Sequence, residues 1–163
     1  MGDELPPPDA AERRQRALEL AYRHLGARDR TTAEVLAHLE RRGVDGLTAA
    51  AAVAGLRDQG YLDDARYAQR FAEDRRRLDA WGDERIARRL EAAGVGAAEI
   101  EAALGEQDHD EARAAAVALL RRRVRVPPAT DRERERALGM LVRRGYGLEL
   151  AHDAVRAFER GAA

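Results

Sequence analysis

Apolar residues recur at every third or fourth position along most of the chain, with polar and charged residues between them. This spacing puts the apolar side chains on one face of a helix and therefore predicts amphipathic helices. In the first predicted helix, over residues 11–25, one face carries Leu18, Tyr22 and Leu25. No stretch alternates apolar and polar residues for long enough to predict a strand, so we expect an all-α protein.

Polar residues and glycines mark where the predicted helices begin and end. Thr31 with Glu34 fits a capping box, in which a hydroxyl and a carboxylate satisfy free backbone donors of the first turn. Thr130 with Glu133 repeats the pattern. Thr48 is predicted to begin a further helix, and Asp83 is predicted to cap another. Glycine accepts the left-handed conformation that ends many helices, and the predicted stops are Gly43, Gly60, Gly94 and Gly145.

Three segments of the chain resemble one another, and they are spaced by 51 residues. They begin at Leu39, Leu90 and Leu141 and each contains a glycine four residues later. The same step relates two further sets of small or apolar residues, namely Val35, Ile86 and Ala137, and Val53, Leu104 and Val155. Several matches in one register predict a repeated unit of about 50 residues, each with three helices.

A three-helix unit of this size is only marginally stable alone, so neighbouring units are expected to stack. We predict three tandem three-helix repeats that form an elongated, curved, solenoid-like array. The predicted divisions are a disordered, proline-rich tail over residues 1–10 and repeats over residues 11–60, 61–107 and 108–163.

The composition excludes several chemistries. The chain has no cysteine and no serine, which excludes disulfides, thiolate metal sites and both common nucleophiles. His109-Asp110 and His152-Asp153 resemble the paired ligands of some metal phosphohydrolases, but further ligands at suitable positions are missing. We expect no metal, no cofactor and no enzymatic activity. The start of the chain lacks a signal-peptide pattern and no apolar run could span a bilayer, so we expect a cytoplasmic protein that contacts no membrane.

Charge is abundant but nearly balanced. Charged residues make up 36% of the chain, the net charge is −1, and all 29 basic residues are arginine. A near-neutral chain is a poor candidate for nonspecific duplex binding, which needs a dense positive surface. Arginine can nevertheless pair with carboxylate or phosphate through two parallel hydrogen bonds.

Two groups of arginines are candidates for binding a partner. The first, the central arginine surface, combines one side of a predicted helix with the helix after it, and comprises Arg66, Arg70, Arg77, Arg85, Arg88 and Arg89. The second, the C-terminal arginine group, comprises Arg121, Arg122, Arg123 and Arg125. Each group is either a solvated face with weak ion pairs or a basic face for an acidic partner or phosphates.

Residues 60–71, Gly-Tyr-Leu-Asp-Asp-Ala-Arg-Tyr-Ala-Gln-Arg-Phe, closely resemble the signature of the RecX family. Segments before and after this stretch also match, so that the resemblance covers roughly residues 17–160. The signature residues are expected to be mainly structural, packing the core or capping a helix: Gly60, Tyr61, Leu62, Asp63, Asp64, Tyr67 and Phe71. The chain departs from the family in lacking lysine and in its proline-rich start.

The resemblance implies three tandem three-helix repeats and a partner, the filament of the RecA recombinase on single-stranded DNA. It implies a regulator of recombination, DNA repair and the SOS response that lies in the filament groove and suppresses ATP hydrolysis and strand exchange. Direct contact with the single-stranded DNA stays open, and we expect a monomer. The alternatives are a helix-turn-helix-like DNA-binding module and a generic helical scaffold for other proteins.

Overall fold

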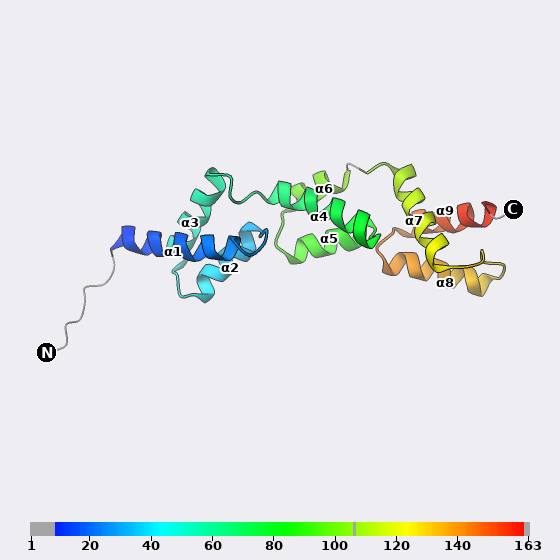
Figure 1. The fold of residues 1–163 in the computed structure, drawn as a ribbon, viewed down its shortest axis with the longest axis horizontal. Coiled ribbons are helices and arrows are strands. Elements are labelled where there is room, and N and C mark those ends of the chain that lie inside the picture. Colours follow the sequence, from blue (N-terminus) through cyan, green and yellow to red (C-terminus); the bar gives the residue numbers. More distant parts are fainter. Residues whose placement is uncertain (1–8, 106, 162–163) are drawn as a thin grey trace. The chain divides into compact units, whose positions relative to one another are not determined.

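The computed structural model describes residues 9–105 and 107–161, and within these ranges the regular secondary structure is all α-helix (Figure 1). The all-α prediction is therefore confirmed. Most of the predicted tail, residues 1–8, lies outside the described residues. The helices are α1 Ala10–Leu25, α2 Thr32–Arg41, α3 Gly46–Asp58, α4 Asp64–Asp79, α5 Asp83–Ala92, α6 Ala97–Gly105, α7 His109–Arg123, α8 Asp131–Arg143 and α9 Leu148–Arg160.

Side-chain caps fix several helix starts. Both predicted capping boxes form, with Thr31 and Glu34 before α2 and with Thr130 and Glu133 before α8. Helix α3 begins two residues before the predicted Thr48, because Asp45 accepts the Thr48 N–H at 3.0 Å.

The prediction for α5 also needs a correction. Asp83 was expected to precede and cap this helix, but it is the first helical residue. Its carboxylate accepts hydrogen bonds from Nε and Nη2 of Arg76, at 3.1 and 2.9 Å, instead of capping the helix. The guanidinium of Arg76 also donates to the carbonyl of Leu104 at 3.2 Å, so this one arginine joins α4, α5 and α6.

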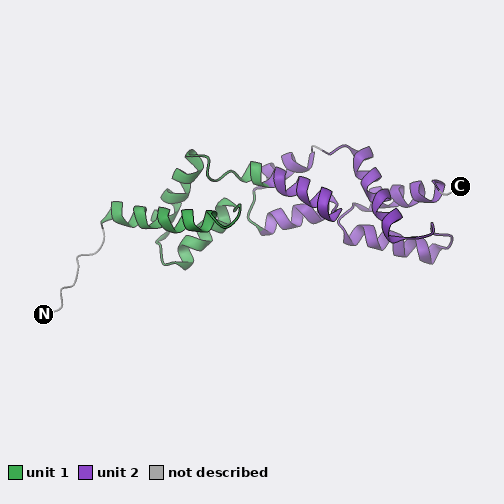
Figure 2. Cartoon of the chain, viewed as in Figure 1, with its two compact units in different colours: residues 1–67, 93–95 green, residues 68–92, 96–163 purple. Residues whose placement is uncertain are grey.

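The chain divides into two compact units (Figure 2). The described part of unit 1 comprises residues 9–67 and 93–95. Helices α1, α2 and α3 all pack against one another in this unit. Ala17 and Ala21 of α1 are fully buried, and such small side chains allow close helix contact. The buried core of unit 1 consists of Ala17, Ala21, Val35, Leu39, Ala49, Ala52, Val53, Leu56 and Leu62.

Unit 2 comprises the described residues among 68–92 and 96–161. Its main core lies where α9 packs against both α7 and α8. The large buried side chains of this core are Leu119, Leu120, Leu141, Tyr146, Val155 and Phe158. The equivalent leucines of the repeat pattern, Leu39, Leu90 and Leu141, are all fully buried, so the 51-residue spacing has a structural counterpart. The three predicted repeat boundaries stay a prediction.

Some apolar positions do not face a core. Tyr61 is 57% exposed, although it was expected to be mainly structural, and Leu78 is 62% exposed. Tyr61 follows the turn at Gly60 and packs edge-on against Tyr22, with ring centroids 5.3 Å apart. Leu78 lies in the last turn of α4.

The same contact occurs once in each unit, and we call it the repeat joint: the turn after one helix meets the first turn of another. In unit 1, the Thr31 hydroxyl at the start of α2 donates to the carbonyl of Ala93 at 2.6 Å. In unit 2, the Gly82 N–H at the start of α5 donates to the carbonyl of Arg144 at 2.9 Å. In both joints the two hydrogen-bonded residues are 62 positions apart in the sequence.

Candidate partner-binding surfaces

The central arginine surface is divided between the two units. Arg66 lies in unit 1, and the other five arginines lie in unit 2. The spacing of Arg66, Arg70 and Arg77 along α4 places them on one side of that helix, and all three are exposed. That the six arginines form one continuous surface stays a prediction.

Arg66 makes several contacts at the start of its own helix, α4. Asp63 accepts the backbone N–H of Arg66 at 2.9 Å, which caps α4. The Arg66 guanidinium donates to the carbonyl of Gly60 at 3.0 Å and lies 3.9 Å from the Asp63 carboxylate. The side chain is nevertheless 55% exposed, so a partner carboxylate could compete with these solvated contacts.

Among the arginines of unit 2, exposure separates surface residues from structural ones. Arg77 is 72% exposed and pairs with Asp74 at 3.0 Å, while Arg88 is 61% exposed and lies 3.9 Å from Glu84. Pairs of this kind contribute little to stability and exchange readily. Arg77 and Arg88 are therefore accessible to a partner.

Arg85 differs, because its guanidinium makes contacts within unit 2. Its guanidinium lies over the ring of Trp81, 4.2 Å from the centroid, and donates to the carbonyl of Arg143 at 3.4 Å. Arg75 lies 5.7 Å from the centroid of the same ring. Such cation–π contacts hold α4 and α5 together. No sequence pattern indicates this role, since Arg85 lies close to the similar arginines Arg88 and Arg89.

In the part of the chain that the structure describes, the C-terminal arginine group forms fewer ion pairs than the central arginine surface. All four of its residues are exposed, at the end of α7 and in the segment that follows it. Among the described residues, none of the four has a carboxylate within ion-pair distance. Three of these arginines occupy the last turn of α7, where the helix dipole favours positive charge.

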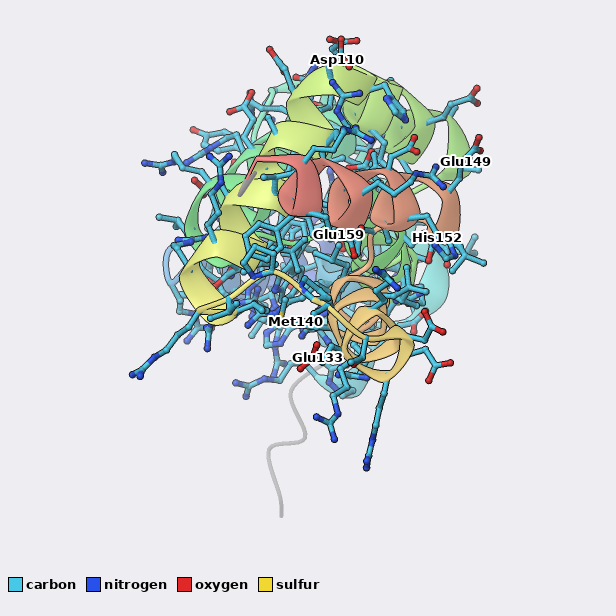
Figure 3. The ribbon with its side chains drawn as sticks, turned by 90° about the vertical axis from the view of Figure 1, so that its right-hand side faces the viewer. Asp110, Glu133, Met140, Glu149, His152 and Glu159 are labelled. Atoms are coloured by element: carbon cyan, nitrogen blue, oxygen red, sulfur yellow. The ribbon has the colours of Figure 1, made fainter. Side chains whose placement is uncertain are left out.

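Beside this group lies an open pocket of about 340 Å³ between the end of α7 and α8. Glu133 and Met140 of α8, labelled in Figure 3, both line it. Hydrogen bonds from the backbone N–H groups of Ala129 and Thr130 keep the pKa of Glu133 below its usual value, so it stays ionised. The pocket lining is Arg123, Val124, Val126, Pro128, Glu133, Arg136, Ala137 and Met140. The two prolines before α8 favour a break in the helix, but no sequence pattern predicts a pocket there.

The signature residues have mainly local contacts. Leu62 is 3% exposed and belongs to the unit 1 core. Tyr67 is half-buried, and this burial raises the pKa of its hydroxyl. Asp64 accepts the Thr32 N–H at 2.8 Å, which ties the start of α4 to the start of α2. Phe71 packs edge-on against Trp81, with centroids 6.3 Å apart.

Two histidines form a neutral stack in unit 1. The rings of His24 in α1 and His38 in α2 lie 3.9 Å apart and nearly parallel, at 6°. Burial lowers the pKa of both rings below the ordinary 6.5. The positive charge of Arg30 lowers both values further. Both rings are therefore neutral at pH 7, and the pair acts as packing rather than as a charged binding site.

The His-Asp pairs do not gather into a metal centre. Asp153 is paired with Arg156, which lowers the pKa of that carboxyl. Among the described residues, no three histidine, aspartate or glutamate side chains lie close enough together to hold a metal ion. The described helices also include none that is long and apolar enough to cross a bilayer.

Comparisons with known proteins agree with this arrangement of three-helix units. Residues 17–64 match the model of the first three-helix domain of RecX, and residues 63–104 match that of the second. The regulatory protein RecX of Mycobacterium tuberculosis strain H37Rv is 35% identical over 156 residues, covering 92% of this chain and 90% of the relative. The RecX of Deinococcus radiodurans is 35% identical over 153 residues, covering 92% and 72%.

Two solved structures share the fold. The crystal structure of RecX from Lactobacillus salivarius superposes with a TM-score of 0.83 at 16% identity, covering 92% of this chain and 99% of that one. A second crystal structure of a regulatory protein RecX gives a TM-score of 0.77 at 20% identity, covering 91% and 73%. With two matched domain models and relatives at 35% identity over nearly its whole length, the chain belongs to the RecX family.

Proposed function

We propose that this chain is a non-catalytic regulator that binds the RecA filament on single-stranded DNA and inhibits its ATP hydrolysis and strand exchange. The proposal further holds that it acts as a monomer in the cytoplasm, during recombination and DNA repair. Membership of the RecX family supports a regulatory role. The C-terminal arginine group is the observation that carries the proposal for binding, because these arginines are exposed and have no carboxylate partner among the described residues.

The chemistry of the surface favours an acidic protein face or phosphates as the ligand. An unpaired, solvated guanidinium loses no internal ion pair when it binds a carboxylate or phosphate. The net charge of −1 means that this attraction is confined to patches of the chain. Contacts of this kind set association rates and register more than total affinity, and they weaken as salt is added.

The decisive experiment is co-sedimentation of the chain with RecA assembled on single-stranded DNA, with DNA-dependent ATP hydrolysis measured in parallel. We expect the chain to sediment with the filament and to reduce the rate of hydrolysis. An unchanged rate together with an unchanged filament length would refute the proposal. Binding to labelled duplex alone, tight and strongly salt-dependent, would instead favour the helix-turn-helix alternative.

Charge reversals locate the surface. One variant changes Arg66, Arg70 and Arg77 to glutamate, and a second changes Arg121, Arg122 and Arg125. A control of equal charge changes three exposed arginines elsewhere in unit 1, namely Arg16, Arg23 and Arg57. Weakened filament binding in the first or second variant, with unchanged helix content and a normal control, would identify the binding group. Equal loss in all three would mean that only overall charge matters.

A further inference from the structure

Three turns of the chain have the same conformation and are spaced by 51 residues. They contain Gly43, Gly94 and Gly145, which have φ angles of +78°, +78° and +92°. Glycine is required there because other residues are strained at positive φ. The hydrogen bonds of the first and third turns also correspond: Val44 N–H donates to Leu39 and Tyr146 N–H donates to Leu141, at 3.1 and 3.2 Å.

Two of these turns are occupied, because they form the repeat joints. A side chain at Gly94 would collide with Cβ of Ala33, in the first turn of α2. A side chain at Gly145 would collide with Arg85, in the first turn of α5. In each joint the carbonyls of the turn accept hydrogen bonds from a helix start. In unit 2 the Gly145 carbonyl accepts the Glu84 N–H at 3.0 Å.

The first turn shares the positive φ of the other two, but no described part of the chain occupies it. A Cβ atom at Gly43 would meet no atom of the described residues within 4 Å. No described residue donates a hydrogen bond to the carbonyl of Arg42 or of Gly43. Arg42 itself is exposed, whereas its counterpart Arg144 donates to the carbonyl of Asp79 at 2.8 Å.

We propose that the turn at Arg42 and Gly43 docks the N-terminal end of an α-helix that belongs to the protein partner. The two repeat joints define the occupant: its first turn must come close to a bare glycine, and it must present N–H or hydroxyl donors. A helix start offers free N–H groups and partial positive charge, which suit the carbonyls at the C-terminal end of α2. Acidic residues, common in first turns, would meet Arg41 and Arg42. This inference rests on the proposed function for the identity of the partner.

A second copy of the chain is a poor occupant. In the 51-residue register, the position equivalent to Gly82 in the third repeat is Glu133. Helix α8 starts at Asp131, one turn earlier than the pattern requires, so Glu133 already lies inside the helix. Its N–H donates to Oγ1 of Thr130, which caps the helix. The third repeat therefore has a glutamate in place of Gly82 at the register position, and its helix start is displaced by about one turn from the geometry of the joint.

The test is a substitution that blocks the turn without unfolding the chain. Asparagine tolerates positive φ better than most residues, so Gly43→Asn adds a side chain where the helix start would approach. Gly60→Asn is the matched control, because Gly60 has a φ of +76° and equally open surroundings but is not in the register. A second pair, Arg42→Glu with Arg57→Glu as its control, leaves both glycines in place. All five proteins are compared by co-sedimentation with RecA on single-stranded DNA and by urea unfolding.

We expect Gly43→Asn and Arg42→Glu to bind the filament at least tenfold more weakly than the wild type, while both controls bind normally. If both test variants bind like the wild type, the inference is wrong and the proposed function stands. Equal losses in test and control variants would also overturn it, since backbone strain or charge alone would then explain the effect. Self-association of the wild type that Gly43→Asn abolishes would assign the turn to a second copy instead. Absence of wild-type binding would overturn the proposed function, and this inference with it.

Discussion

Replacing Thr31 with valine tests how much of the stability of unit 1 depends on a single buried hydroxyl. Thr31 is fully buried, and its Oγ1 has two partners. It accepts the Glu34 N–H at 3.1 Å and donates to the carbonyl of Ala93 at 2.6 Å. Valine keeps the shape of threonine but removes both hydrogen bonds.

The expected cost follows from these two bonds. Loss of the cap costs about 1 kcal/mol, and leaving the Ala93 carbonyl without its donor adds about 1–2 kcal/mol. Thr130 offers a matched control, because it caps α8 in the same way but is exposed and has only the capping bond. We therefore expect Thr31→Val to lower the free energy of unfolding by about 2–3 kcal/mol, and Thr130→Val by about 1 kcal/mol.

The measurement is urea unfolding followed by far-ultraviolet circular dichroism, which reports on all helices. With a denaturant slope of about 1–3 kcal/mol per molar, the difference between the two variants is a readily measured shift in midpoint. Thr31→Ser should restore most of the loss, because it keeps the hydroxyl. Equal losses for Thr31→Val and Thr130→Val would refute the reasoning, since the bond to Ala93 would then contribute nothing.

Three further predictions concern packing and pH. Gly145→Ala should lower the free energy of unfolding by more than about 2 kcal/mol, because the new Cβ would collide with Arg85 at a φ of +92°; a smaller change in urea would contradict this. Arg85→Met should cost about 1 kcal/mol and alter the fluorescence of Trp81, whose ring it covers; an unchanged spectrum would argue against the contact. The lowered pKa of His24 and His38 means that the unfolded chain binds protons more readily below pH 6.5. The contribution of the histidine stack to the free energy of unfolding is therefore complete above that pH and declines as the pH falls towards the folded-state pKa values. The double variant His24→Gln, His38→Gln should reduce this loss of stability in acid. An unchanged dependence of the free energy of unfolding on pH would show that other groups cause it.

The helices and much of the core could be predicted because each depends on local spacing. The leucines at 39, 90 and 141 repeat with one step, and buried positions of a repeated unit must repeat with it. The capping boxes at Thr31 and Thr130 were also predictable, because they involve residues only three positions apart.

The roles of individual arginines could not be predicted in this way. Arg76, Arg85 and Arg144 each donate to a backbone carbonyl far along the chain, 28, 58 and 65 residues away. Arg77 and Arg88 instead stay on the surface. A long, flexible side chain has the same local pattern in both cases, and only tertiary structure decides its partner. The exposure of Tyr61 was missed for a related reason, since its neighbour Tyr22 comes from another helix.

The repeat joint also constrains how the length of such a chain can change during evolution. In both units the partners are separated by the same stretch of sequence, so duplicating or deleting one complete repeat leaves each remaining glycine turn opposite a helix start. An insertion of any other size inside a helix of the joined segment would shift the turn away from its donors. Gene length in this family should therefore vary by whole repeats or within exposed loops.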